Sequence, residues 1–289
     1  MKVKAAAKIN LMLDVLGTLP NGYHSLFMIM QSVSCYDTVC VKRTEKNEIV
    51  IKTADRRIPT DEKNIAYKAA KEFFSFNNIK DCGIEIEIEK NIPMAAGLAG
   101  GSADGAGVIY CLNELYNTDL PLNTLCSIGE KAGADVPFSL TGGTALCMDT
   151  GGVIAKLPEL ENCFIVLCKP DMSVSTVSAY KLLDEAEFIR HADKTAMLYA
   201  MKNKDYSLMA GKAKNVFEQV IEVPKRPYIK SAMKQFGADF SLMSGSGPTV
   251  YGVFSEEASA SQCAKYLKTR FPETILCAPC KVPIEVIEK

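Results

Sequence analysis

Hydrophobic and polar positions alternate along the first segment of the chain. Across residues 9–15 the aliphatic side chains occupy the odd positions, whereas Lys8, Asn10 and Asp14 occupy even positions. A period of two predicts a β-strand, so Lys8 and Asn10 are expected on its polar face. Pro20-Asn21-Gly22 predicts a turn directly after this strand.

Further elements follow from the same patterns. Residues 38–42 and 48–52 are predicted to form a hairpin. Residues 61–77 predict a helix, because Asn64 is suited to the N-cap and small or aromatic residues recur at helical spacing. The clearest strand is 84–89, where isoleucines expected to face a core alternate with glutamates expected to face water.

A glycine-rich segment follows that strand, from Pro93 to Ser102, and a helix is expected from near Ser102 to Asn117. Glycines let the backbone approach a ligand closely, and the free N–H groups of a helix start favour a phosphate. The segment is neither a Walker loop nor a dinucleotide fingerprint. The alternative is an ordinary strand-to-helix loop capped by Ser102. Asp104, in the first helical turn, either complements the helix dipole or contributes to binding Mg²⁺.

The pattern changes near Pro158, so two domains are expected, 1–157 and 158–289. A helix over 123–132 ends before Gly133 in the first of them. The second part opens with an apolar run over 163–168. Helices are expected over 176–189, 193–202, 205–220 and 226–236. A strand is expected on each side of a second glycine cluster, Met243-Ser244-Gly245-Ser246-Gly247-Pro248.

Composition narrows the class of protein. Hydrophobic residues make up 48% of the 289 residues, which is enough for a buried core. The net charge of −1 leaves no broad basic surface for nucleic acid, and no apolar run is long enough to span a membrane. Polar residues also interrupt the first apolar stretch, so a secretory signal is not predicted. We therefore expect a cytoplasmic protein, monomeric or homodimeric, that binds a small molecule.

The 11 cysteines are expected to be reduced core thiols in such a compartment. Cys277-Ala278-Pro279-Cys280 is an isolated CxxC, which without a second pair is a weak signal for a metal or redox site. A structural role is favoured for it.

Three further sets of residues carry chemistry. Asp135 lies between a helix-ending glycine and Pro137, and it is either a helix cap or a general base. Lys8 is either a solvated surface lysine or an ion-pair partner of Asp135. Next to a phosphate, the carboxylate accepts a hydroxyl proton and the ammonium stabilises negative charge. Tyr23 and His24 offer a stacking ring and a hydrogen-bonding ring to a heterocycle, or else pack and cap locally.

Taken in order, these segments resemble the GHMP kinase superfamily. Five stretches carry the resemblance: Ala7-Lys8-Ile9-Asn10-Leu11, Asn21-Gly22-Tyr23-His24, Ile92 to Ser102, Gly133-Ala134-Asp135-Val136-Pro137-Phe138, and Met243 to Thr249. They span nearly the whole chain. The glycine loop alone is unspecific, whereas the Lys-Ile-Asn, Gly-Tyr-His and Gly-Ala-Asp-Val-Pro-Phe set is specific.

The resemblance implies a two-domain α+β fold, with an N-terminal domain like ribosomal protein S5 domain 2, a C-terminal ferredoxin-like domain and an active site between them. It implies transfer of phosphate from ATP, with Mg²⁺, to the 2-hydroxyl of a methylerythritol unit joined to cytidine diphosphate. The residues expected at ATP are Pro93, Ala95, Ala96, Gly97, Leu98, Ala99, Gly100, Gly101 and Ser102.

The resemblance also implies roles for single residues. Asp135 is the expected base, and Lys8 orients and polarises the reacting groups. The expected substrate contacts are Asn10 at the erythritol portion, Tyr23 stacked on cytosine, His24 at the cytosine edge, Met30 near the base and Thr176 as a substrate-side hydroxyl.

The chain departs from the family pattern in places. Ala99 replaces a glycine, which is acceptable if its φ is negative, and Ala103 removes a second serine hydroxyl. Met30 stands where some members have phenylalanine near the cytosine, so stacking there is either weaker or supplied by Phe27.

Two alternatives remain. One is another GHMP kinase acting on a mevalonate-type alcohol, homoserine or a sugar, which would have no use for the Tyr23–His24 clamp. The other is a non-catalytic nucleotide-binding regulator, which would have no use for both Lys8 and Asp135.

Overall fold

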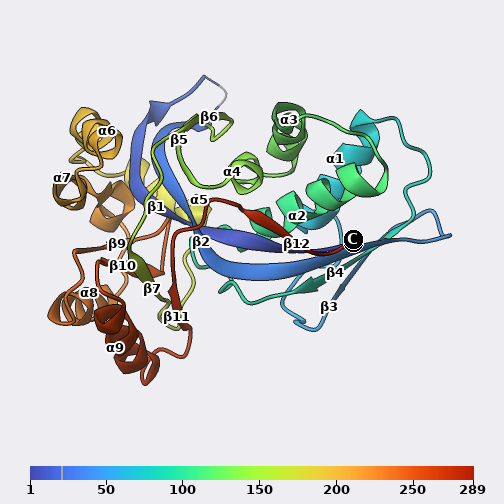
Figure 1. Ribbon diagram of the computed structural model, residues 1–289. Coiled ribbons are helices and arrows are strands. Elements are labelled where there is room, and N and C mark those ends of the chain that lie inside the picture. The colour runs from blue at the N-terminus through green and yellow to red at the C-terminus, as the bar shows by residue number, and fades with distance from the viewer. Residues whose placement is uncertain (21) are drawn as a thin grey trace.

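The computed structural model describes residues 1–20 and 22–289. The predicted turn at Pro20-Asn21-Gly22 therefore includes one residue, Asn21, outside the described residues. The described part holds two β-sheets with helices packed on them, which confirms the α+β class (Figure 1). No helix within it is long and apolar enough to cross a membrane.

The larger sheet has eight strands with the order β12-β1-β2-β4-β3, while β5 pairs with β2 and β6, and β8 pairs with β1. Its strands are β1 Lys2–Thr18, β2 His24–Arg43, β3 Ile49–Thr53, β4 Ile84–Glu89, β5 Thr144–Asp149, β6 Val153–Lys156, β8 Lys214–Asn215 and β12 Ile284–Glu288. The helices that follow these strands early in the chain are α1 Ile65–Phe76, α2 Gly100–Leu115, α3 Leu122–Ala132 and α4 Val136–Thr141.

The smaller sheet has the order β11-β7-β10-β9. Its strands are β7 Phe164–Cys168, β9 Phe240–Met243, β10 Val250–Phe254 and β11 Thr274–Cys277. With α8 Arg226–Gln235 before β9 and α9 Glu257–Lys268 before β11, the chain follows the β-α-β-β-α-β pattern of a ferredoxin-like unit. The remaining helices are α5 Thr176–Asp184, α6 Lys194–Asn203, α7 Tyr206–Lys212 and the short 3₁₀ helix η1 Val216–Gln219.

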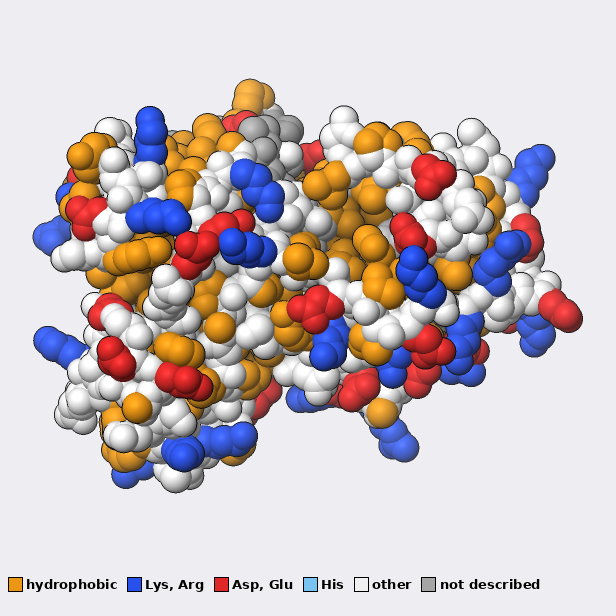
Figure 2. Space-filling view, in the orientation of Figure 1, with side chains coloured by type: hydrophobic (Ala, Val, Ile, Leu, Met, Phe, Trp, Pro, Cys, Tyr) orange, Lys and Arg blue, Asp and Glu red, His pale blue; other side chains and the backbone are white. Residues whose placement is uncertain are grey.

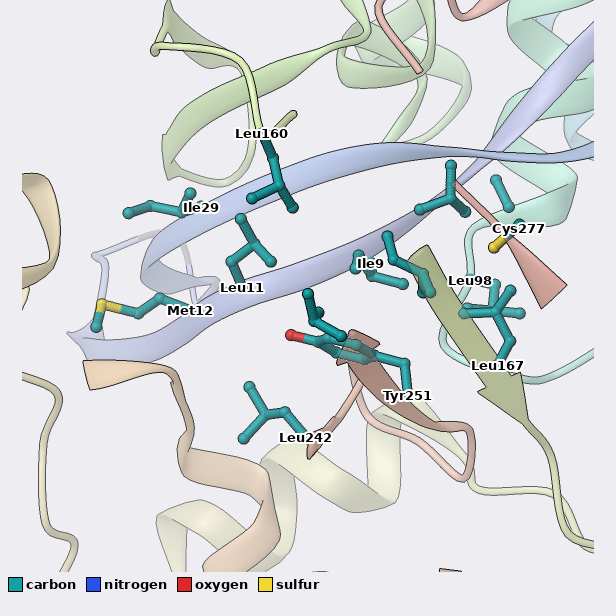
Figure 3. Packing of buried hydrophobic residues seen from close by; sticks show 14 of the residues in the cluster. Ile9, Leu11, Met12, Ile29, Leu98, Leu160, Leu167, Leu242, Tyr251 and Cys277 are labelled. Atoms are coloured by element: carbon teal, nitrogen blue, oxygen red, sulfur yellow. The ribbon is translucent and has the colours of Figure 1, made fainter. Parts of the chain in front are cut away.

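The strand β7 explains why its sequence shows no alternation. Val166 and Cys168 pack against α8 and α9, whereas Ile165 and Leu167 pack against residues of β1. Both faces of this strand are therefore buried, and both must be apolar. Figure 3 shows the second contact, with Ile9 and Leu11 of β1 close to Leu167 and Tyr251 of the smaller sheet.

The strand β1 is likewise enclosed on both sides. The polar residues predicted on one face of this strand are buried and do not face water. Lys8 is 5% exposed, and Asn10 and Asp14 are 0% exposed. Polar side chains buried in this way need partners. Asp14 finds them in Val15 N, His191 Nδ1, Ala192 N and Lys194 Nζ, at 2.9–3.1 Å.

Several sequence predictions are confirmed. The Asn64 side chain accepts a hydrogen bond of 2.9 Å from Ala66 N at the start of α1. The isoleucines of β4 are buried, and Glu87 and Glu89 are exposed. The helix α3 ends at Ala132, directly before Gly133 as predicted.

Two predictions are wrong. The strands β2 and β3 do not form a hairpin, because β4 lies between them, antiparallel to β2 and parallel to β3. The segment 205–220 is not one helix, because α7 ends at Lys212 and β8 then pairs with β1. In both cases a distant strand supplies hydrogen bonds that local periodicity does not reveal.

Candidate active site

A single cavity of about 1100 Å³ receives side chains from both halves of the chain. Its lining includes all nine residues predicted at ATP, together with Lys8, Asp135, Tyr23, His24 and Thr176. On the face of the molecule shown in Figure 2, positive and negative side chains are interspersed, in keeping with the net charge of −1. The tertiary structure therefore brings together most of the candidate residues.

The glycine loop takes an unusual backbone path along this cavity. Ala95, Gly97 and Ala99 have φ values of 48°, 75° and 56°. The expectation that Ala99 has a negative φ is wrong, since Ala99 is the left-handed N-cap of α2. Left-handed alanine is strained, and such strain clusters at ligand-binding segments.

Two contacts hold the loop in place. Lys8 N donates to Leu98 O at 3.1 Å, and the Ser244 hydroxyl donates to Gly97 O at 2.8 Å. A Cβ atom at Gly97 would overlap the Ser244 carbonyl, so only glycine fits there. The two glycine clusters of the sequence are thus packed directly against each other.

The helix α2 begins at Gly100, two residues before the predicted start at Ser102. Ser102 lies inside the first turn and lines the cavity, so it is not a plain N-cap. The N-terminal N–H groups of a helix lack intrahelical partners and favour an anion. The cavity meets α2 at this end, which suits a phosphate group.

A buried charged triad lies beside this end of α2. Lys90 Nζ donates to Asp104 Oδ2 at 2.6 Å and also to Asp37 Oδ2. Asp37 Oδ1 accepts from the backbone N–H groups of Asn91 at 2.6 Å and Ile92 at 2.8 Å. Asp104 Oδ1, in contrast, is a buried atom without a partner.

The pKa of Asp104 is raised to about 7, mainly by burial; the Lys90 ammonium lowers it, and the negative charge of Asp37 adds to the rise. A carboxyl group that holds a proton near neutrality is a poor ligand for a cation. Among the described residues, no group of three or more His, Cys, Asp or Glu side chains is arranged to hold a metal ion.

Lys8 and Asp135 both line the cavity and form an ion pair. Lys8 Nζ lies 3.6 Å from Asp135 Oδ2 and donates to Asn10 Oδ1 at 2.8 Å. The Lys8 side chain is 6% exposed, whereas that of Asp135 is 30% exposed. Asp135 precedes α4 without making a side-chain cap, so its carboxylate is accessible from the cavity.

His24 and an unpredicted aromatic residue form another part of the wall. The ring of Tyr180 stacks on His24, with ring centroids 4.4 Å apart and an interplanar angle of 19°. His24 Nε2 also lies 2.8 Å from Asp184 Oδ1. Thr176, Tyr180 and Asp184 are spaced four residues apart on α5, so helical spacing from Thr176 could have identified both neighbours.

The Thr176 hydroxyl lies 3.1 Å from the Ser246 hydroxyl, and both residues line the cavity. Ser246 was not singled out, although it belongs to the second glycine cluster. Its contact with α5 depends on the tertiary fold.

Asn10, Met30 and the alternative Phe27 do not reach the cavity surface. Asn10 and Met30 are 0% exposed and Phe27 is 6% exposed, and the lining contains none of them. The structure therefore does not support their predicted contact with substrate. Asn10 is instead occupied by Lys8 and the backbone of Gly245, while Met30 packs in a core cluster.

The CxxC residues also lie away from the cavity lining. Burial raises the pKa of the Cys280 thiol to about 11 and raises that of the Cys277 thiol well above its usual value. Protonated thiols are weak nucleophiles and weak metal ligands, in agreement with the structural role favoured from the sequence.

Comparisons with known proteins agree with this arrangement. The family described as GHMP kinases N terminal domain matches residues 64–143, and GHMP kinases C terminal matches residues 197–273. A 4-diphosphocytidyl-2-C-methyl-D-erythritol kinase from Clostridium perfringens is 42% identical over 274 residues, which are 94% of each chain.

Solved structures show the same fold. A 4-(cytidine 5'-diphospho)-2C-methyl-D-erythritol kinase superposes with a TM-score of 0.78 at 27% identity, over 96% of this chain and 99% of that one. A homoserine kinase from Cytophaga hutchinsonii has a TM-score of 0.81 at 21% identity, over 99% and 97% of the two chains, so the fold by itself does not select a substrate. The chain belongs to the GHMP kinase family of ATP-dependent small-molecule kinases.

Proposed function

We propose that the chain transfers the γ-phosphoryl group of ATP to the 2-hydroxyl of 4-diphosphocytidyl-2-C-methyl-D-erythritol, giving the 2-phosphate and ADP. This is the substrate in the names of relatives such as those of Clostridium perfringens and Clostridium beijerinckii, which are 42% and 41% identical to this chain. The proposal includes a division of the chain into an N-terminal part, 1–157, that holds ATP and a C-terminal part, 158–289, that completes the cleft.

One observation carries the proposal. A continuous cavity of about 1100 Å³ joins the glycine loop, the Lys8–Asp135 pair and the His24–Tyr180 wall. That volume exceeds the upper end for a single drug-sized ligand, as two substrates bound together require. The reacting hydroxyl is then held between a phosphate site and a nucleobase site.

The chemistry follows from the central pair. The half-buried Asp135 carboxylate accepts the proton of the attacking hydroxyl, and Lys8, 3.6 Å from it, stabilises the charge that develops on the transferred phosphoryl group. The buried ammonium acts strongly because little water screens it. Transfer is direct and in line, and no covalent enzyme intermediate forms.

The nucleobase site is the basis for substrate choice. Tyr23 is 66% exposed, and it lines the cavity together with Tyr180, which stacks on His24. We assign stacking on the cytosine to these two tyrosines and hydrogen bonding at its edge to His24. Mevalonate, homoserine and simple sugars lack an aromatic base that could stack on the tyrosines and bind His24.

Mg²⁺ enters the proposal with ATP. It is commonly held by phosphate oxygens, water and only one or two carboxylates, so the lack of a dedicated cage among the described residues is compatible with it. The ion would neutralise charge on the phosphates. Asp104 is not among its ligands, because its carboxyl group is paired with Lys90 and burial raises its pKa.

A coupled ADP-release assay tests the proposal, with Mg-ATP and the cytidyl substrate beside mevalonate, homoserine and galactose. Turnover with the cytidyl substrate alone is expected. Turnover with a control alcohol only would leave the family standing and refute the substrate. Folded protein that binds ATP but turns over none of the four compounds would instead indicate a regulator.

The variant His24→Ala locates the nucleobase site. Loss of a hydrogen bond and a stacked ring is expected to raise KM for the cytidyl substrate about 10-fold, with KM for ATP unchanged. Loss of ATP binding instead would mean that His24 belongs to the other subsite.

A further inference from the structure

Asn215 lies outside every motif noted in the sequence, yet it occupies a central place in the fold. It ends β8, which runs parallel to β1 with Leu13 opposite Asn215. The residue is 2% exposed, and it does not line the cavity. A buried amide at such a position must have its donors and acceptor satisfied.

The two ends of this amide bind different segments. Asn215 Oδ1 accepts from Phe217 N at 3.0 Å and caps η1. Asn215 Nδ2 donates to Met243 O at 2.8 Å and to Gly245 O at 2.7 Å. The donor end therefore holds the second glycine cluster, while the acceptor end holds the backbone of Phe217 at the start of η1.

The segment held in this way continues to the reacting groups. Gly245 N donates to Asn10 Oδ1 at 3.0 Å, and the same oxygen accepts from Lys8 Nζ at 2.8 Å. Ser244, which lies between Met243 and Gly245 in the chain, donates through its Oγ to Gly97 O in the ATP loop at 2.8 Å. One short segment thus contacts the glycine loop directly and Lys8 through Asn10.

We propose that Asn215 is a positioning residue for phosphoryl transfer. By fixing the backbone of residues 243–245, it orients Lys8 through Asn10 and supports the ATP loop through Ser244. It acts entirely through other residues and does not touch substrate. The inference rests on the proposed function for its effect on turnover, but its effect on ATP binding is independent of the second substrate.

The variant Asn215→Asp separates the two ends of the amide. It keeps the acceptor for Phe217 N and replaces the donor by an oxygen that repels the carbonyls of Met243 and Gly245. Small misplacements of a catalytic group can cost about 100-fold, so kcat is expected to fall about 10- to 100-fold. KM for the cytidyl substrate should stay within about 3-fold of the wild-type value. The hydrogen bonds that the variant loses do not touch the substrate, so their loss should change its binding little.

Protonation offers a readout that a purely structural role would not give. At low pH the introduced carboxyl group regains one O–H donor, so the ratio of variant to wild-type kcat should rise as pH falls. Ser244→Ala removes only the hydroxyl on Gly97 and should raise the Kd for ATP about 2- to 10-fold. Asn215→Asp should raise this Kd by a similar factor.

Asn113→Asp is the matched control. The Asn113 side chain also accepts from a backbone N–H, that of Leu120 at 3.0 Å, and donates to a carbonyl, but it lies in α2 away from the cavity lining. This control should lose stability without changes in kcat, in the Kd for ATP or in their pH dependence.

The measurements are kcat, the Kd for ATP by calorimetry, and the thermal midpoint of each variant. If Asn215→Asp matches Asn113→Asp in kcat and Kd at a temperature where both are folded, the inference is overturned. A loss that follows only the unfolded fraction, or that does not recover at low pH, also overturns it. If the wild-type chain fails to turn over the cytidyl substrate, the proposed function fails, and the Kd values still decide whether Asn215 supports the ATP loop.

Discussion

Two lysine–carboxylate clusters line the same cavity and differ in how much of each is exposed. Lys8 lies 3.6 Å from Asp135, whose side chain is 30% exposed. Lys90 contacts both Asp104, at 2.6 Å, and Asp37, and these two carboxylates are 4% and 0% exposed. The first, which we call the open cluster (Lys8 and Asp135), leaves a carboxylate accessible to a ligand. In the second, which we call the closed cluster (Lys90, Asp104 and Asp37), the charged groups are buried and contact one another.

The difference shows that a lysine next to a carboxylate can serve either chemistry or stability, depending on its burial. Asp37 uses both of its oxygens, one for Lys90 and one for two backbone N–H groups, so removing it leaves buried donors unpaired. Asp135 leaves its carboxylate available for a substrate proton. We therefore expect changes in the open cluster to affect turnover and changes in the closed cluster to affect stability.

The largest effect is expected at the open cluster. Asp135→Ala should lower kcat by about 10²- to 10⁴-fold because the general base is lost, while the Kd for ATP changes little. Steady-state kinetics and calorimetry on the same preparation measure both quantities. An unchanged kcat would contradict the role of Asp135 as base.

The converse is expected at the closed cluster. Asp37→Ala removes one partner of a buried ion pair and should lower the free energy of unfolding by about 3–5 kcal/mol, as measured by urea denaturation. Asp55→Ala, at an exposed ion pair with Arg57, serves as a control that should leave the midpoint nearly unchanged. Equal midpoints for the two variants would show that the triad does not stabilise the fold.

The pH dependence of stability sharpens the comparison. The pKa of Asp104 is raised from 3.8 to about 7, mainly by burial, so the folded chain binds a proton there that the unfolded chain releases above about pH 4. Its contribution to the free energy of unfolding therefore falls as pH rises from about 4 to about 7, and then levels off.

Asp104→Asn stays neutral at every pH and should lack this part of the slope. Urea denaturation of both proteins between about pH 5 and about pH 8 tests the expectation. Parallel curves for the variant and the wild type would mean that Asp104 is ionised throughout and that Lys90 outweighs burial.

The smallest effect concerns the loop that runs between the clusters. Ala99 has a φ of 56°, and left-handed alanine costs roughly 1–2 kcal/mol relative to the right-handed form. Ala99→Gly relieves that cost but adds backbone entropy, so a gain in stability of about 0.5–1 kcal/mol is expected. Ala103→Gly, in the interior of α2, should instead lose about 1 kcal/mol. Thermal midpoints of the two variants should move in opposite directions.

Much of the site could be predicted from the sequence because its parts are local. The glycine loop, Lys8, Asp135, His24 and Thr176 all line the cavity. Residues that act through distant contacts were missed. Asn215 carries no local signal of its own, whereas Tyr180 follows Thr176 by four residues on α5 and Ser246 lies in the second glycine cluster. Asn10 was expected to contact a ligand although it is fully buried.

The fold divides in a similar way. Helix α1 with its Asn64 cap and strand β4 follow from local periodicity and capping chemistry, which involve neighbours within a few residues. The position of β4 between β2 and β3 does not, because strand pairing depends on partners far along the chain. The return of β12 to the edge of the first sheet, beside β1, was equally invisible.

The sequence by itself determined the family of this chain and which glycine, acidic, basic and aromatic residues are available for its chemistry. These are properties of residue type and short spacing. Only the tertiary structure decided which lysine–carboxylate pair is open to the cavity and which is closed, with exposures of 30% for Asp135 and 4% for Asp104. Exposure depends on what covers a side chain from elsewhere in the chain. For Asp104 that covering comes from the packing of α2 against strands of the larger sheet.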